Sequence, residues 1–219
     1  MTLILKGFMN NNSGFMGRCP ILFISVFFFT IMLSASLAAQ SWDFIKEKDG
    51  IKIYTRHEAG MDLKSYRGVT DINAPAEKIY ALIENINDND WWDKNLTQIK
   101  VLKYEKNKGR QYYMIYSSPW PVSDRDICVD VSISRDTVTG ECIFKSVAAS
   151  GVVPERDGIV RIKDFRQTWT ITPAGKEMTH IILEGYIDPD GSIPDWISNM
   201  LVSNSPYKAI VGVRDHVKK

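Results

Sequence analysis

The segment SSPWPVSDRD (Ser117–Asp126) lies between two runs, 110–116 and 126–134, that have the composition of β-strands. It carries two prolines around a tryptophan, and then places an arginine and an aspartate side by side where the second strand begins. A connection this short can join antiparallel neighbours, whereas parallel strands need a crossover of about a dozen residues or more. The segment therefore predicts an antiparallel pair of strands.

Further strands are predicted on both sides of this pair. Turns such as EKNKG, RDTVTG and PAGKE are charged or contain glycine, and they are again too short for parallel crossovers. The predicted strands cover residues 51–56, 63–72, 99–104, 110–116, 126–134, 141–146, 160–172 and 178–187.

Two helices complete the pattern. Residues 73–86 have a proline in the first turn and apolar residues at helical spacing. Residues 194–217 also place apolar residues at mostly helical intervals, and Pro206 is expected to kink or interrupt that helix. We predict an α+β fold in which a long C-terminal helix covers the apolar face of an antiparallel sheet.

The N-terminal 39 residues differ from the rest of the chain. They contain two basic residues and no acidic residue, and the apolar run 21–39 ends in ASLAA. This layout is typical of a secretory signal peptide, so we expect residues 1–39 to be removed and 40–219 to form one domain that is periplasmic or secreted. The alternative is an uncleaved membrane anchor at 21–39, since about 20 apolar residues can cross a bilayer.

The net charge bears on the class of partner, and the positions of the cysteines bear on disulfide pairing. The formal net charge of the chain is +1, so no strong field favours nucleic acid, and no nucleic-acid partner is predicted. Cys128 and Cys142 follow the N-terminal segment, and the register of the predicted hairpin does not place them opposite each other. We expect both thiols to be unpaired.

The familiar catalytic motifs are not found in the sequence. It has no nucleophile elbow, phosphate-binding loop, zinc-protease motif, C-x-x-C pair or dinucleotide fingerprint. The three histidines, His57, His180 and His216, lie on separate elements, so no metal site and no cofactor are predicted. A triad assembled by the fold stays possible from sequence alone.

Apolar residues alternate along two of the predicted strands. Ile127, Val129, Val131 and Ile133 share one face of the first strand, while Phe165, Gln167, Trp169 and Ile171 share a face of the second. A bent sheet that closes on a helix can be filled by its own side chains or can hold a ligand. Alternation does not distinguish the two.

Four segments in order resemble the START (StAR-related lipid-transfer) family of the helix-grip superfamily. They are WWDKNLTQIKVL (91–102), YYMIYSSPWPVSDRD (112–126), VPERDGIVRIKDF (153–165) and DPDGSIPDWISNM (188–200). The resemblance runs over nearly the whole chain from Trp42 to the C-terminus. The resemblance implies a curved antiparallel sheet wrapped around the C-terminal helix.

The resemblance also suggests roles for the opening segment. Pro119 and Pro121 would fix an extended connection between two strands, because each restricts φ and lacks an amide hydrogen. Arg125 and Asp126 are adjacent and should point to opposite sides of a strand, so each is expected to fix the start of the strand through its own partners.

The function that the resemblance implies is non-enzymatic binding of a lipid or sterol-like ligand between sheet and helix, by a monomer that contacts membranes transiently. The terminal helix and the turn at 135–140 are candidate gates. The family's sterol-binding members carry an arginine where this chain has Val131, which favours a more apolar pocket here. Candidate lining residues are Val129, Val131, Ile133, Trp169, Ile171, Trp196, Met200 and Tyr207.

Two alternatives stay open at this level. The first is an enzyme of the same superfamily, such as a cyclase or hydrolase acting on a hydrophobic substrate. A histidine, a tyrosine and a carboxylate that converge in the cavity would favour it. The second is a sensor held at a bilayer by residues 21–39.

Overall fold

The structure is a computed structural model that describes residues 41–87, 91–191 and 193–218. Ten strands form one sheet in the order β1-β2-β3-β10-β9-β7-β6-β5-β4, with β8 paired to β6 outside that path. All neighbours are antiparallel except β6 and β8. The elements are β1 (Asp43–Lys48), β2 (Ile51–Arg56), β3 (Ser65–Ile72), α2 (Ala76–Glu84), β4 (Leu96–Glu105), β5 (Gly109–Tyr116), β6 (Asp124–Arg135), β7 (Cys142–Ala148), β8 (Ile159–Arg161), β9 (Asp164–Pro173), β10 (Thr179–Asp188) and α3 (Asp195–His216).

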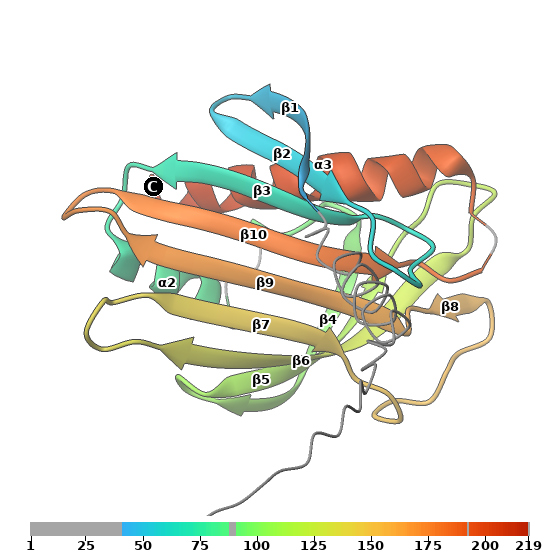
Figure 1. The fold of residues 1–219 in the computed structure, drawn as a ribbon. Helices are drawn as coiled ribbons and strands as arrows, with labels where there is room; N and C mark the ends of the chain where they lie inside the picture. The colour runs from blue at the N-terminus through green and yellow to red at the C-terminus, as the bar shows by residue number, and fades with distance from the viewer. Residues whose placement is uncertain (1–40, 88–90, 192, 219) are drawn as a thin grey trace, which may run out of the picture. The chain divides into compact units, whose positions relative to one another are not determined.

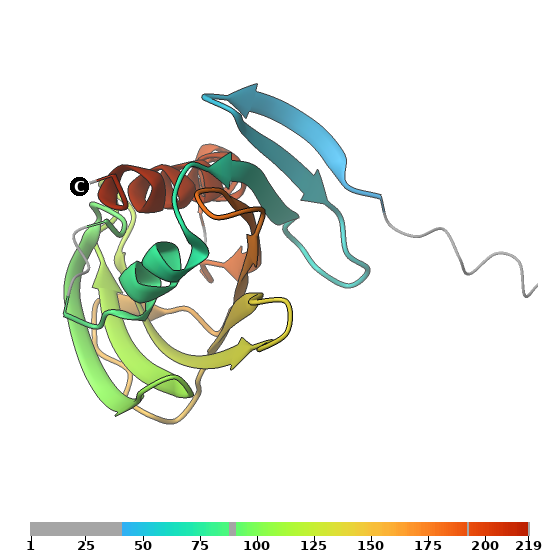
Figure 2. The ribbon, with the colours of Figure 1, turned by 90° about the vertical axis from the view of Figure 1, so that its left-hand side faces the viewer.

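The predicted α+β fold, with a curved antiparallel sheet and a long C-terminal helix, is confirmed. Figure 1 shows α3 running along the β2–β3 side of the sheet, and α3 contacts β2, β3 and β10. Figure 2 shows the strands curving from β4 and β5 round towards β10, with α3 along the open side of the curve. The domain proposed for residues 40–219 contains this sheet and helix.

Two glycines allow α3 to approach its neighbours closely. A Cβ at Gly68 of β3 would lie 2.6 Å from the Cδ1 of Ile210, and a Cβ at Gly212 would lie 2.2 Å from the carbonyl oxygen of Trp91. Pro206 was expected to kink or interrupt this helix, but α3 continues through it. Pro206 is buried and its Cβ would lie 3.5 Å from a Cβ at Gly68, so tertiary packing offsets the hydrogen bond that proline removes.

The sequence prediction missed one strand and merged two others. β1 was missed because it is an edge strand whose side chains are mostly exposed, so its sequence DFIKEK lacks a buried face. The predicted strand 160–172 is two strands, since β8 pairs with β6 whereas β9 pairs with β7 and β10. The chain changes partners at residues 162–163. Among the described residues, no helix is long and apolar enough to span a membrane.

β5 and β6 are buried on both faces. Ile127 and Val129 point into the main core, whereas Tyr113, Ile115 and Cys128 form a second apolar cluster on the opposite face. Leu102, Ala149, Val153 and Ile159 pack against that second cluster. The segment between β7 and β9 therefore covers the outer face of β5 and β6.

A buried ion pair holds this covering segment in place. Asp126 accepts hydrogen bonds from Nε and Nη2 of Arg161 at 2.6 and 3.0 Å, and its Oδ2 accepts another from Tyr113 Oη at 2.8 Å. The side chains are 1% and 8% exposed for Asp126 and Arg161. Arg161 also donates to the carbonyl oxygens of Val153 and Pro154. Asp126 thus connects β6 to β8 and to the preceding loop.

Arg125 points to the other face of the sheet. It donates to the carbonyl oxygens of Pro189 at 3.3 Å and Asp190 at 3.2 Å, and also to that of Ser123. These carbonyls lie before β6 and in the loop that leads to α3. The adjacent Arg125 and Asp126 therefore join β6 to two different loops.

Cys128 and Cys142 are free and buried, as expected. Cys142 belongs to the main core, and Cys128 to the outer cluster. Burial raises the pKa of the Cys142 thiol to about 11, so this group is not a thiolate at neutral pH.

We expect Asp126→Asn to lower the free energy of unfolding by about 3–5 kcal/mol, because it leaves the Arg161 guanidinium buried without a counterion. Denaturant unfolding of the variant measures this directly. Glu155→Gln is the matched control, since it breaks the Glu155–Lys163 pair in the same covering segment, where both side chains are 63% exposed. The control should lower the free energy of unfolding by less than about 1 kcal/mol. Equal losses of stability in the two variants would contradict the role of Asp126.

The same contacts predict an acid dependence. Burial raises the pKa of Asp126, but hydrogen bonds from Arg161 and Tyr113 offset this and leave the pKa below its usual value. An aspartate in the unfolded chain has a pKa of about 3.9. The stabilisation is therefore fully present above that pH and is lost as pH falls through the lower pKa of the folded state. The stability difference between wild type and Asp126→Asn should shrink only in that acidic range.

Candidate ligand-binding cavity

A cavity of about 300 Å³ lies between the inner face of the sheet and α3. Its floor is formed by the inward side chains of β5 and β6, which alternate with the outward ones described above. These residues are Arg110, Tyr112, Met114 and Tyr116 from β5, and Arg125, Ile127, Val129 and Val131 from β6. The two-residue period of the strands thus produces a continuous wall.

The opposite wall comes from the far side of the curve and from α3. β9 contributes Phe165, Gln167 and Trp169, β7 contributes Phe144 and Ser146, and α3 contributes Met200, Ser205, Lys208 and Ala209. Most of this lining is apolar, which suits a hydrophobic ligand.

Edge-to-face aromatic contacts fix the shape of one side. Trp91 packs against Trp169 with ring centroids 6.4 Å apart, and Trp92 packs against Tyr112 at 5.5 Å. Trp91 and Trp92 also contact each other at 5.6 Å. The segment before β4 is therefore bound to both β5 and β9, and such contacts are favourable beyond their buried area.

The structure brings four of the eight candidate lining residues together. Val129, Val131, Trp169 and Met200 line the cavity. Ile171 is fully buried in the packed core, and Ile133 packs against the edge of that core. Tyr207 lies on the other side of α3, where its hydroxyl donates to Asp49. Trp196 belongs to α3, but its side chain lies outside the described part of the chain.

The lining of this cavity does not include Ile133, Ile171 or Tyr207, because a shared strand face or helical spacing does not fix depth along the element. Ile133 and Ile171 lie beyond the end of the cavity on their strands. The 135–140 turn follows Ile133 on the chain, and it does not contribute to the lining.

Arg110 and Tyr112 also line the cavity, although neither was among the predicted lining residues. This chain has Val131 where the family's sterol-binding members carry an arginine, and that difference favoured an apolar pocket. However, Arg110 is the residue that faces Val131 across the β5–β6 pair. Arg110 is 6% exposed, and Tyr112 is 2% exposed. The alternation of residues 110–116 could have identified both, because it places Arg110, Tyr112, Met114 and Tyr116 on one face.

Burial keeps the tyrosines of the cavity neutral. Desolvation raises the pKa of Tyr112 to about 12 although the charge of Arg110 acts in the opposite direction. Desolvation likewise raises the pKa of Tyr66 to about 12, and it raises the pKa of Tyr116. At neutral pH these side chains are hydroxyl groups that can donate a hydrogen bond.

The loop that carries the two prolines lies at one side of the cavity. Pro119 and Val122 line it, while Trp120 between them is 91% exposed. The amide of Val122 donates to the carbonyl oxygen of Pro119, and the amide of Ser118 donates to Asp124. The loop therefore has internal hydrogen bonds, and its tryptophan projects into solvent.

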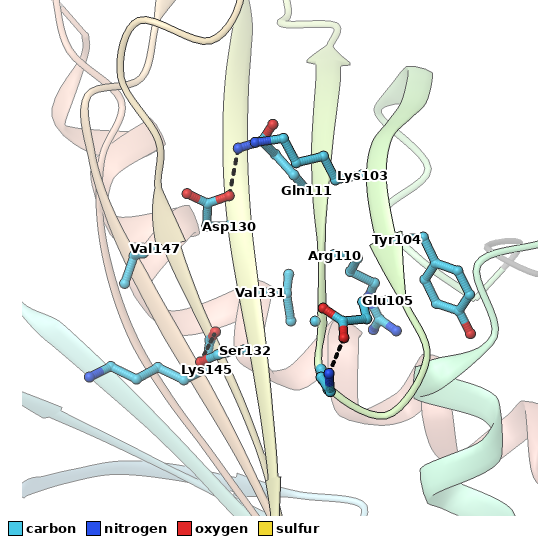
Figure 3. Close-up of a pocket in the computed structure, with 12 residues that line it drawn as sticks. Lys103, Tyr104, Glu105, Arg110, Gln111, Asp130, Val131, Ser132, Lys145 and Val147 are labelled. Atoms are coloured by element: carbon cyan, nitrogen blue, oxygen red, sulfur yellow. Dashed lines mark hydrogen bonds and ion pairs between the residues drawn. The ribbon is translucent and has the colours of Figure 1, made fainter.

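A second hollow, of about 680 Å³, lies on the outer face of β4 to β7 (Figure 3). Figure 3 shows its charged lining, with Gln111 directed at Asp130. Glu105 accepts a hydrogen bond from Lys108. The hollow is lined mainly by polar and charged side chains, and it shares Arg110 and Val131 with the inner cavity. The inner cavity is the better candidate for an apolar ligand, because hydrophobic burial drives binding there.

Within the described ranges, no cluster of three or more histidine, cysteine or acidic side chains is placed to hold a metal ion. None of the described residues that line the inner cavity is a histidine. The cavity offers aromatic and aliphatic groups together with hydroxyl, amide and guanidinium groups, the carboxylate of Asp93 and the ammonium of Lys208.

Comparison with known proteins agrees with this architecture. The START domain profile matches residues 31–219. An uncharacterized protein of Pseudomonas aeruginosa is 32% identical over 187 residues, which cover 85% of this chain and 92% of that relative. The phosphatidylcholine transfer protein of Homo sapiens is 28% identical over 178 residues, covering 77% of this chain and 80% of the relative.

A solved structure is similar over the same region. It is a STAR-related lipid transfer protein fragment from Xanthomonas axonopodis, which has a TM-score of 0.73 and 27% sequence identity. The match covers 81% of this chain and 99% of that one. The profile, the relatives and the helix-grip architecture agree, and the chain belongs to the START domain family.

Proposed function

We propose that this protein binds a lipid in the inner cavity and carries it between membranes as a monomer, without converting it chemically. The observation that carries the proposal is an apolar cavity bounded by the sheet on one side and α3 on the other. Burial of apolar surface contributes about 25 cal/mol per Å², so a hydrocarbon chain can be held there without many polar contacts.

The relatives support lipid as the ligand class. One is named for transfer of phosphatidylcholine and a solved structure for transfer of lipid. A cavity of about 300 Å³ is at the lower end of the range for ligand sites. A single acyl chain suits this volume better than a two-chain lipid, which requires the cavity to widen, and movement of α3 is the simplest way to widen it.

A test is to fill the cavity. Val129→Phe adds an aromatic ring to its floor and should reduce uptake of lipid from mixed phospholipid vesicles by at least about tenfold, because the ring takes the space of the ligand. Native mass spectrometry of the purified full chain, before and after exposure to vesicles, counts bound lipid. Val147→Phe is the matched control, since Val147 lines the outer hollow.

Equal loss of uptake in the two variants would show that the inner cavity is not the site. A wild-type protein that stays empty in every vesicle mixture would reject the lipid-carrier function. Thermal unfolding of both variants shows whether the larger side chain has been accommodated, since overpacking costs about 1–3 kcal/mol.

We further propose that the Trp120 loop contacts the membrane. Trp120 is 91% exposed, and its neighbours Pro119 and Val122 line the cavity. Tryptophan favours the membrane–water interface because its ring is apolar and its indole nitrogen can donate a hydrogen bond. Insertion of this side chain would bring the cavity to the lipid surface.

Trp120→Ala should slow transfer of a fluorescent phospholipid between vesicles several-fold while leaving the amount bound at equilibrium unchanged. Val138→Ala is the matched control, because Val138 is 93% exposed in the turn after the far end of β6. The strand has 12 residues, so the two sites are separated by roughly 35 Å. Equal transfer rates for wild type and Trp120→Ala would reject this contact.

We also propose export of the protein. The basic start, the apolar run 21–39 and its small-residue end support removal of residues 1–39. N-terminal sequencing of the protein from the exported fraction of its own host should find a mature start at Ala39 or Gln40. Recovery of the intact segment in the membrane fraction would instead indicate an anchored protein.

A further inference from the structure

Three residues that line the cavity each have a buried polar side-chain atom without a hydrogen-bond partner. Among the described residues, six buried side-chain nitrogen or oxygen atoms are unpartnered. Half of them, Arg110 Nε, Tyr112 Oη and Trp92 Nε1, belong to residues of this one cavity. Buried polar groups are nearly always hydrogen-bonded, so a cluster of exceptions at a cavity indicates a missing partner.

Arg110 carries the charge of the cluster. Its Nη1 and Nη2 donate to the carbonyl oxygens of Glu84 and Ile83, at 2.9 and 2.6 Å, at the C-terminal end of α2. The helix dipole there offsets only about half a charge. No ion pair of the described residues includes Arg110, and the Glu84 side chain accepts its bonds from Tyr104 and from the Asn107 amide.

Tyr112 contacts both of the other residues, Arg110 and Trp92. It lies two residues from Arg110 on the same face of β5, with the guanidinium 5.6 Å from its ring centroid. Its ring meets that of Trp92 edge-to-face at 5.5 Å. The neutral hydroxyl of Tyr112, the indole N–H of Trp92 and the Nε–H of Arg110 are three donors, and together they carry one positive charge.

We propose that Arg110, Tyr112 and Trp92 bind the anionic head group of the ligand, a carboxylate or a phosphate, inside the cavity. This assignment rests on the proposed lipid-binding function and specifies its ligand. A carboxylate or phosphate accepts from all three donors and balances the buried guanidinium, whereas a neutral ester leaves that charge uncompensated.

The rest of the cavity provides a path for the hydrocarbon chain. Met114 and Tyr116 continue the Arg110–Tyr112 face along β5 towards the Pro119 loop, and Ile127 and Val129 run beside them on β6. The path from Arg110 to Tyr116 is roughly 20 Å long at about 3.3 Å per residue. The ligand would then lie with its head against α2 and its chain directed towards Trp120.

The test compares three probes with the same acyl chain: oleate, 1-oleoyl-lysophosphatidate and methyl oleate. Binding to the purified full chain is measured by displacement of a fluorescent fatty acid. At least one anionic probe should bind about tenfold or more tightly than methyl oleate, the scale of one hydrogen bond to a charged group. Tighter binding of oleate identifies a carboxylate ligand, and tighter binding of lysophosphatidate identifies a phosphate.

Tyr112→Phe and Trp92→Phe each remove one donor and keep an aromatic ring, so each should reduce that preference by about tenfold. Arg110→Gln should abolish the preference, and circular dichroism shows whether α2 persists in that variant. Tyr104→Phe is the matched control, because its hydroxyl bonds Glu84 on the outer face. Its preference should equal that of wild type.

The outcomes separate this inference from the function on which it rests. Binding of all three probes with similar affinity, unchanged in Tyr112→Phe and Trp92→Phe, overturns the head-group site and leaves lipid binding in place. Binding of none of the three probes also overturns the head-group site, and both fail if the wild-type protein in addition takes up no lipid from vesicles.

Discussion

The two-residue period of β5 and β6 is the constraint on which the rest of the structure depends. Because successive side chains point to opposite faces, Asp126 enters the outer face and Arg125 the inner one. Asp126 binds Arg161 and holds the covering segment, while Arg125 binds the carbonyls of the loop that leads to α3. One pair of adjacent charged residues thus fixes both layers that enclose these strands.

The inner face combines rigid walls with polar groups that are not satisfied by the protein itself. Aromatic contacts bind Trp91 and Trp92 to β9 and β5, so the wall around Tyr112 is well defined. An unpartnered buried donor destabilises the folded chain, and three of them belong to residues that line this cavity. Fixed walls with unsatisfied donors are what a preorganised binding site requires, because a ligand can then supply the missing acceptor.

Much of the fold could be predicted from local signals, whereas the depth of each residue could not. The predicted strand 51–56 matches β2, and the C-terminal helix begins and ends within one residue of its predicted limits. Local patterns missed the partner change between β8 and β9, since it is the pairing of β8 with residues 124–126 of β6, a contact between distant segments, that separates the two strands. They also did not separate Val129, which lines the cavity, from Ile133 on the same face of the same strand.

The sequence by itself determined the α+β class, the antiparallel pairing and the opposite directions of Arg125 and Asp126, because these follow from turn length and strand period. The tertiary structure alone decided which inward side chains meet at a cavity and which pack against each other. That distinction depends on the curvature of the sheet and on the position of α3, which contacts between distant segments set. Arg110 shows the difference: its place on the inner face follows from alternation, but its unpartnered Nε beside Tyr112 and Trp92 depends on how α2 and the segment before β4 pack against β5.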